Sequence, residues 1–135
     1  MESSGWHSHC FDDTHQMKVL IAEDTDSVQF ALRMLVEHLG HEVVACANDG
    51  KEALVKYGQT HPELVLMDVR MPEMDGLTCT AQLAAQDPHA KVVIVTGGRT
   101  TEREARQAGA RGFVEKPFEM AQLDQLLYAL SKTKT

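Results

Sequence analysis

Three acidic residues, a threonine and a lysine stand at or just beyond the ends of short apolar runs of the sequence. The pair Glu23-Asp24 follows the first run, Asp68 the third and Thr96 the fourth, and Lys116 comes shortly after the fifth. Three carboxylates held close together raise one another's pKa values unless a cation neutralises them. Oxygen ligands without Cys or His suit a hard ion, and Mg²⁺ is the intracellular ion that also tolerates phosphate oxygens. These residues therefore predict a Mg²⁺ site that handles phosphate.

Phosphoryl transfer needs little beyond such a site, because positioning and electrostatics supply most of the catalysis. A carboxylate beside Mg²⁺ is a competent phosphoryl acceptor, and Asp68 is the candidate. Lys116 can neutralise charge on the opposite side, and the Thr96 hydroxyl can donate to a phosphoryl oxygen. Taken singly, these residues are typical of helix caps, strand ends and solvated surfaces. Their combination favours the site.

Five apolar runs alternate with segments of helical spacing, and this alternation predicts the fold. A β-α repeat implies a parallel sheet covered by helices on both faces, and near-continuous apolar runs are typical of its strands. We expect a doubly wound α/β fold with five helices and the flavodoxin-like strand order 2-1-3-4-5, whose ligand crevice lies at the carboxyl ends of the strands. The predicted strands are Val19–Ala22, Val43–Ala47, Leu64–Met67, Val92–Val95 and Gly112–Val114.

The segment after the first run has the clearest helical pattern. Asp26 or Ser27 can cap its start, and Gly40 stands where a left-handed residue ends a helix. The segment Thr101–Ala108 offers only two alanines to a core, so we expect it to be the loosest helix. The residues predicted to form the buried stripe of the first helix are Val28, Ala31, Leu32, Leu35, Val36 and Leu39.

Four strings, taken in order and with their spacing, resemble the receiver domains of bacterial response regulators, and the match spans residues 18–131. This resemblance implies that Asp68 accepts phosphate from a histidine on a partner histidine kinase or histidine phosphotransfer protein. The strings are Leu20–Asp24, Leu66–Gly76, Val95-Thr96 and Glu115–Phe118.

The resemblance also implies roles around the acceptor. Asp24 and the backbone carbonyl of Arg70 would join Asp68 around the metal, with Glu23 binding directly or through water. Thr96 and Phe113 would relay phosphorylation to the surface formed by residues 101–108, residues 112–114 and the helix beginning at 119.

Three positions near this site differ from the residues that are common in the family. Glu23 replaces the commoner aspartate of the acidic pair. Gly97-Gly98 stands where relatives often carry Ala or Ser and then a longer side chain, which affects loop flexibility and phosphate lifetime. Phe113 carries no phenolic hydroxyl. The family resemblance further implies a cis peptide bond at Lys116-Pro117, a bond type that costs little before proline.

The 135 residues carry a formal net charge of −7, which disfavours direct binding to nucleic acid or to anionic membranes. A downstream protein target is the expected partner, with the chain a monomer or a phosphorylation-dependent dimer. Three dispersed cysteines indicate a reducing compartment, and no apolar stretch approaches the roughly 20 residues of a membrane span, so we expect a cytoplasmic protein. His7, His9, Cys10 and His15 fit no structural zinc spacing.

We expect residues 1–17 to be a flexible extension, 18–131 a receiver domain, and 132–135 a tail or the start of a linker. The leading hypothesis is a signalling switch that catalyses only its own phosphorylation and slow dephosphorylation. An Asp-nucleophile phosphatase is one alternative, but its D-x-D-x pattern would need an aspartate where Glu23 stands. A degenerate receiver that only binds proteins is the other, although both Asp68 and Lys116 are present.

Overall fold

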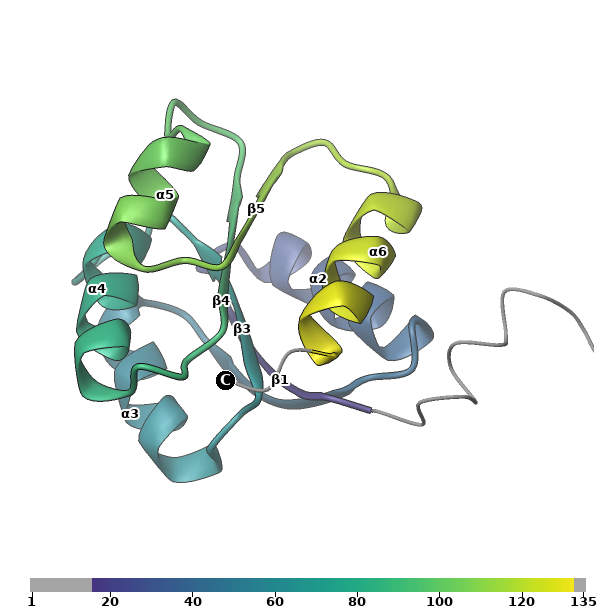
Figure 1. The fold of residues 1–135 in the computed structure, drawn as a ribbon, viewed down its shortest axis with the longest axis horizontal. Coiled ribbons are helices and arrows are strands. Elements are labelled where there is room, and N and C mark those ends of the chain that lie inside the picture. The colour runs from purple at the N-terminus through teal and green to yellow at the C-terminus, as the bar shows by residue number, and fades with distance from the viewer. Residues whose placement is uncertain (1–15, 133–135) are drawn as a thin grey trace, which may run out of the picture.

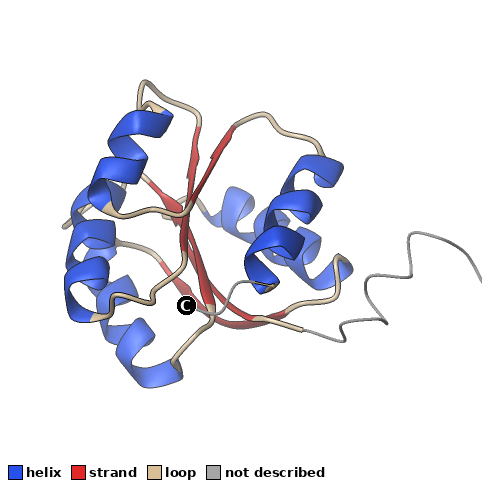
Figure 2. Cartoon of the chain, viewed as in Figure 1, coloured by secondary structure: helices blue, strands red, loops and turns tan. Residues whose placement is uncertain are grey.

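The computed structural model describes residues 16–132, and they form one five-stranded parallel sheet between helices (Figure 2). The strand order β2-β1-β3-β4-β5 and the parallel pairing of all neighbours confirm the predicted topology. Each predicted strand is present, with bounds that differ by at most one residue at either end. The strands are β1 Lys18–Ala22, β2 Glu42–Ala47, β3 Leu64–Asp68, β4 Val92–Thr96 and β5 Gly112–Glu115.

The five predicted helices cover both faces of the sheet. Figure 1 shows α3, α4 and α5 on one face and α2 and α6 on the other. This arrangement divides the apolar interior into two clusters, one on each side of the strands. The helices are α2 Asp26–His38, α3 Gly50–Thr60, α4 Gly76–Gln86, α5 Glu102–Ala108 and α6 Met120–Ser131.

Alternate residues of each central strand pack into opposite clusters, because successive side chains of a strand point to opposite faces. In β1, Val19 and Ile21 contact the cluster beneath α2 and α6. Leu20 and Ala22 contact the cluster beneath α3, α4 and α5. Met17, directly before β1, is also fully buried. The central strands are thereby held from both sides, and their carboxyl ends are fixed in position.

The first helix departs from its predicted stripe in two details. Leu32 and Val36 are buried, but Ala31 is exposed, because its position lies at the margin of the stripe that faces the sheet. Thr25 is the N-cap residue, and no side chain caps the helix, so the predicted cap by Asp26 or Ser27 is wrong. Gly40 has a φ of +95°, which confirms the left-handed residue predicted after this helix.

The short α5 helix buries one alanine, Ala105, in keeping with its thin apolar face. A capping box between Thr101 and Glu104 defines its start, and Gly109 ends it in the left-handed conformation. The expectation that this helix is the loosest stays a prediction. Residues 1–15 of the extension predicted over 1–17, with His7, His9, Cys10 and His15, lie outside the described residues. The predicted boundary is wrong at Met17, which is buried in the core and donates its backbone N–H to His41 Nδ1.

Candidate functional site

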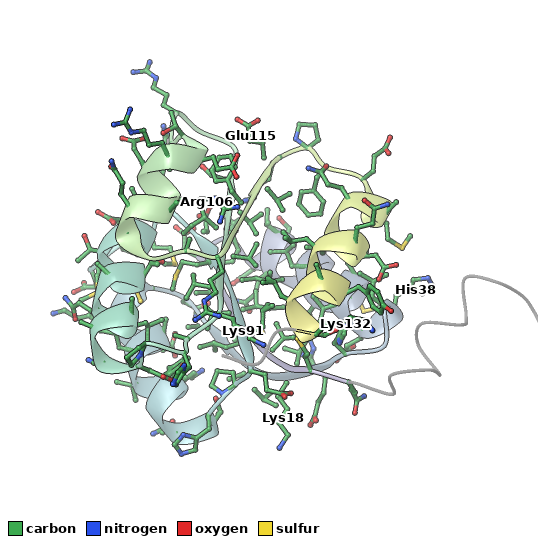
Figure 3. The ribbon with its side chains drawn as sticks, viewed as in Figure 1. Lys18, His38, Lys91, Arg106, Glu115 and Lys132 are labelled. Carbon is green, nitrogen blue, oxygen red and sulfur yellow. The ribbon has the colours of Figure 1, made fainter. Side chains whose placement is uncertain are left out.

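The polar residues predicted to form a site do meet at the carboxyl ends of the strands. Figure 3 marks the two edges of the sheet, with Lys18 at the start of β1 and Glu115 at the end of β5. At the edge where Glu115 lies, an open pocket of about 370 Å³ brings together all the predicted site residues except Phe113. Its lining comprises Glu23, Asp24, Thr25, Val28, Asp68, Arg70, Thr96, Gly97, Gly98 and Lys116.

Lys116 reaches across the pocket from the end of β5 to two carboxylates. Its Nζ lies 3.1 Å from Glu23 Oε1 and 3.6 Å from Asp68 Oδ1. Glu23 is almost fully buried, so its charge is balanced within the protein by this lysine. The Lys116-Pro117 peptide bond is cis, which confirms the prediction for this turn.

Glu23, Asp24 and Asp68 form an acidic cluster in which one oxygen from each carboxylate lies within 4.8 Å of the others. Burial is the largest cause that raises the pKa of Asp68, followed by the charge of Glu23. Lys116 and the Val69 backbone amide act in the opposite direction. Because Lys116 pairs with two of the three carboxylates, Glu23 and Asp68, the cluster keeps negative charge that favours a further cation. A set of oxygen ligands suits a hard divalent ion.

The backbone around Asp68 is fixed by a close approach at the start of α4. A Cβ added to Gly76 would collide with the carbonyl oxygen of Asp68, so only glycine lets the helix begin this near the strand end. Gly76 N donates to Val69 O at 2.8 Å, and the Asp75 side chain caps the helix by accepting from Thr78 N. The loop that carries Arg70 is therefore anchored at both ends.

The acidic pair lies on a loop that is joined to the neighbouring turn after β2. Glu23 N donates to Ala47 O at 2.9 Å, and Thr25 N donates to Glu23 Oε2 at 3.2 Å. The Gln29 side chain donates to Glu23 O at 2.8 Å. This role of Gln29 was not predicted from the sequence, because the apolar pattern of a helix gives no information on which of its polar side chains will meet a distant partner.

Thr96 and Phe113 occupy neighbouring strands but different environments. Thr96 is buried at the end of β4, and its Oγ1 accepts from Gly98 N at 3.1 Å. Phe113 pairs in register with Ile94 and packs, half-buried, against the cluster beneath α5. The predicted switch residues therefore lie on adjacent strands, with Thr96 in the pocket and Phe113 outside it.

The Arg70 side chain extends from the loop after β3 toward the loop after β4. Its guanidinium nitrogens lie 3.3 and 3.4 Å from the position that a Cβ on Gly98 would occupy. A longer side chain at residue 98 would displace this guanidinium. Because Gly98 has no side chain, the exposed Arg70 guanidinium can lie at the rim of the acidic pocket. The sequence did not predict this contact.

A sequence model of the response regulator receiver domain matches residues 19–128. The chain belongs to this family. Among curated relatives, the chemotaxis protein CheY of Listeria monocytogenes is 40% identical, covering 86% of this chain and 97% of the relative. CheY of Thermotoga maritima is 34% identical over 85% of this chain and 98% of its own length.

Solved structures of receiver domains have the same architecture. A CheX–CheY–BeF3–Mg²⁺ complex from Borrelia burgdorferi contains a chain with a TM-score of 0.82 and 27% identity, covering 90% of this chain and 94% of that chain. A two-component response regulator of the LuxR family from Aurantimonas sp. gives 0.82 at 31% identity, covering 87% and 86%. The protein is a receiver domain of two-component signalling, consistent with a phosphoryl-accepting switch, and nothing in these comparisons favours a phosphatase or a binding module without chemistry.

Within residues 16–132, every helix is too short or too polar to cross a membrane.

Proposed function

We propose that Asp68 accepts a phosphoryl group from a phosphohistidine on a partner protein, in a reaction that requires Mg²⁺ bound in the acidic pocket. The observation that carries the proposal is the position of the Asp68 carboxylate, 3.6 Å from Lys116 Nζ and within 4.8 Å of the two other acids. This arrangement supports the proposal, because the Asp68 carboxylate lies near both a lysine and two further carboxylates. The chain would act as a signalling switch that catalyses only its own phosphorylation and slow dephosphorylation.

Asp24, Asp68 and the backbone carbonyl of Arg70 would hold the metal, with Glu23 binding it directly or through water. The oxygen-only donor set fits Mg²⁺. The pKa of Asp68 is raised first by burial and then by the charge of Glu23, and a bound cation would lower it. The related CheY chain in the complex with BeF3 and Mg²⁺ supports the same choice. When bound, Mg²⁺ would neutralise charge on the phosphoryl oxygens.

In the transfer step, an Asp68 carboxylate oxygen attacks the phosphorus as the phosphorus–nitrogen bond of the donor breaks, and the imidazole keeps the bonding electrons and takes up a proton. Lys116 stabilises the phosphoryl oxygens from the side of β5. The Thr96 hydroxyl can donate to them while its oxygen accepts a hydrogen bond from Gly98 N. Positioning of this kind supplies most of the catalysis in phosphoryl transfer.

The donor and the target of the signal would both be proteins. The formal net charge of −7 disfavours nucleic acid and anionic membranes, and α2, which begins beside the pocket, exposes the apolar side chains of Phe30 and Met34. We assign the donor to a histidine kinase or a histidine phosphotransfer protein in the cytoplasm. The chain would work as a monomer or a phosphorylation-dependent dimer, with residues 18–131 as the receiver unit.

Phosphorylation would be read at the surface formed by α5, β5 and α6. A phosphoryl group on Asp68 offers new acceptors to Thr96, whose movement would leave space beside β4. The ring of Phe113, half-buried next to β4, could turn inward to fill it. A charge-assisted hydrogen bond is strong enough to bias two ring positions that differ by a few kcal/mol.

Titration with Mg²⁺, followed by amide chemical shifts, tests the proposed site. We expect saturable binding of modest affinity to the wild type, at least tenfold weaker binding to Asp24→Asn, and wild-type binding to Asp26→Asn. Asp26 is the matched control, since it is an exposed acid at the start of α2. Unchanged affinity in Asp24→Asn would contradict the assignment.

A further inference from the structure

Gln29 lies in the first turns of α2, and its side-chain amide points back to the loop that carries the acidic pair. Its Nε2 donates to Glu23 O at 2.8 Å and to Asn48 Oδ1 at 3.0 Å, with Ala47 O at 3.4 Å as a longer third acceptor. Two of these acceptors are backbone carbonyls, which have no donor, so the amide nitrogen must face them. One side chain thereby joins the loop after β1 to the turn after β2.

The acceptor on Glu23 matters because that carbonyl belongs to the peptide unit linking Glu23 to Asp24. A peptide unit is planar, so fixing its oxygen fixes its orientation and with it the direction in which both side chains leave the backbone. The amide on the other side of Glu23 is fixed as well, because Glu23 N donates to Ala47 O at 2.9 Å. Both peptide units that flank Glu23 are therefore tied to the turn after β2.

That turn is itself held rigidly enough to serve as an anchor. Asn48 N donates to Glu52 Oε1 at 2.6 Å, and this hydrogen bond is the largest cause that lowers the pKa of Glu52. Lys56 Nζ lies 3.2 Å from Glu52 Oε2 and donates to Cys46 O at 2.7 Å. The end of β2 and the start of α3 are thus bound together on both sides of Asn48.

We propose that Gln29 is a positioning residue for the metal site, holding the Glu23-Asp24 peptide in the orientation that brings Asp24 into the acidic cluster. The inference rests on the proposed function, since it concerns the affinity of the same pocket for Mg²⁺. Residues that orient metal ligands without touching the metal typically contribute 10–100-fold to metal affinity. Within residues 16–132, the hydrogen bonds of the Gln29 amide go to two backbone carbonyls and to Asn48 Oδ1, so its effect would pass through the backbone of the acidic loop.

Gln29→Met tests this inference, because methionine keeps the length and helical preference of glutamine but cannot donate a hydrogen bond. We expect Mg²⁺ to bind this variant about tenfold more weakly than the wild type, measured by amide shifts or fluorescence under conditions where urea unfolding shows both proteins fully folded. At saturating Mg²⁺, labelling by acetyl phosphate should recover its wild-type rate. The matched control is Gln82→Met, at an exposed glutamine of α4, which should bind Mg²⁺ normally.

Asn48→Ala provides a second variant that keeps the inference testable if Gln29→Met folds poorly. It removes one acceptor of the amide and leaves Glu23 O in place, so we expect a smaller loss of affinity. The loss of Mg²⁺ binding free energy in the double variant Gln29→Met/Asn48→Ala should be smaller than the sum of the losses in the two single variants, as expected for residues in one network. Affinity within twofold of the wild type in Gln29→Met, or an equal loss in Gln82→Met, would overturn the inference. A wild type that binds no Mg²⁺ would instead overturn the proposed function.

Discussion

Replacing Asp68 by asparagine should stabilise the fold when no divalent cation is present. The pKa of Asp68 is raised in the folded protein, first by burial and then by Glu23, so the ionised carboxylate lowers stability above the unfolded pKa of about 3.9. Asparagine has nearly the same shape and carries no charge. The extra stability of Asp68→Asn over the wild type should be absent below about pH 3.9. It should grow as the pH rises toward the pKa of Asp68 in the folded protein and be complete above that pKa.

The distances in the pocket set the size of the charge–charge part of this effect, to which burial of the Asp68 carboxylate adds in the same direction. Carboxylate oxygens within 4.8 Å of one another repel by about 3.5 kcal/mol per pair at an effective dielectric constant of about 20. Lys116, at 3.6 Å from Asp68, attracts by about 4.6 kcal/mol on the same basis. Asp68 thus meets two repulsions and one attraction, a net cost of about 2 kcal/mol that screening at the exposed Asp24 reduces to about 1 kcal/mol.

Urea unfolding in EDTA at pH 7.5 provides the assay. With an m-value of about 2 kcal/mol/M, the midpoint of Asp68→Asn should rise by about 0.5 M. Glu42→Gln, at an exposed residue of β2, changes the net charge equally and should leave the midpoint near wild type. Mg²⁺ at 100 times its dissociation constant should raise the free energy of unfolding of the wild type by about 2.7 kcal/mol. The wild type should then be more stable than Asp68→Asn. A midpoint below wild type for Asp68→Asn in EDTA would refute the reasoning.

Two further effects can be measured. With beryllofluoride, a phosphoryl mimic, amide shift changes should extend from Asp68 to Phe113 and α5, and changes confined to the pocket would contradict the relay. Tyr57→Phe removes the 2.8 Å hydrogen bond to Asp87, the largest cause that lowers the pKa of Asp87. Because this pKa is depressed, the free energy of unfolding of the variant should be about 0.5–1 kcal/mol lower than that of the wild type at pH 7. Its difference from wild type in urea should vanish as the pH falls through the pKa of Asp87, and a difference that persisted at low pH would exclude this cause.

The sheet and the residues at its carboxyl edge were predictable because each depends on a local pattern. Near-continuous apolar runs marked the strands, and the order of a doubly wound sheet then brought their carboxyl ends together. Glu23, Asp68 and Thr96 could be placed at this edge because each stands at the end of such a run, and their combination with Lys116 then favoured a site. The prediction that Ala31 is buried was wrong. It lies at the edge of the apolar stripe of α2, and the packing of the helix on its neighbours, which the sequence does not give, determines whether such an edge residue is covered.

The supports of the site could not be read from local patterns. Gln29 acts through acceptors at Asn48 and Ala47, 19 and 18 residues away along the chain, so its role depends on the register of β1 against β2. Gly76 is needed because its helix begins against the carbonyl of Asp68, a contact between backbones that no side-chain pattern records. Tertiary geometry, more than residue type, determines these contributions.

The central claim is that Asp68 is the phosphoryl acceptor and that the reaction depends on Mg²⁺. The most direct test is incubation with acetyl phosphate and Mg²⁺, followed by trapping of the acyl phosphate with borohydride and peptide mass spectrometry. We predict modification at Asp68 in the wild type, its loss in EDTA, and no labelling in Asp68→Asn, while Asp26→Asn is labelled normally. Persistent labelling of Asp68→Asn at another residue, or labelling of the wild type that is independent of Mg²⁺, would contradict the account.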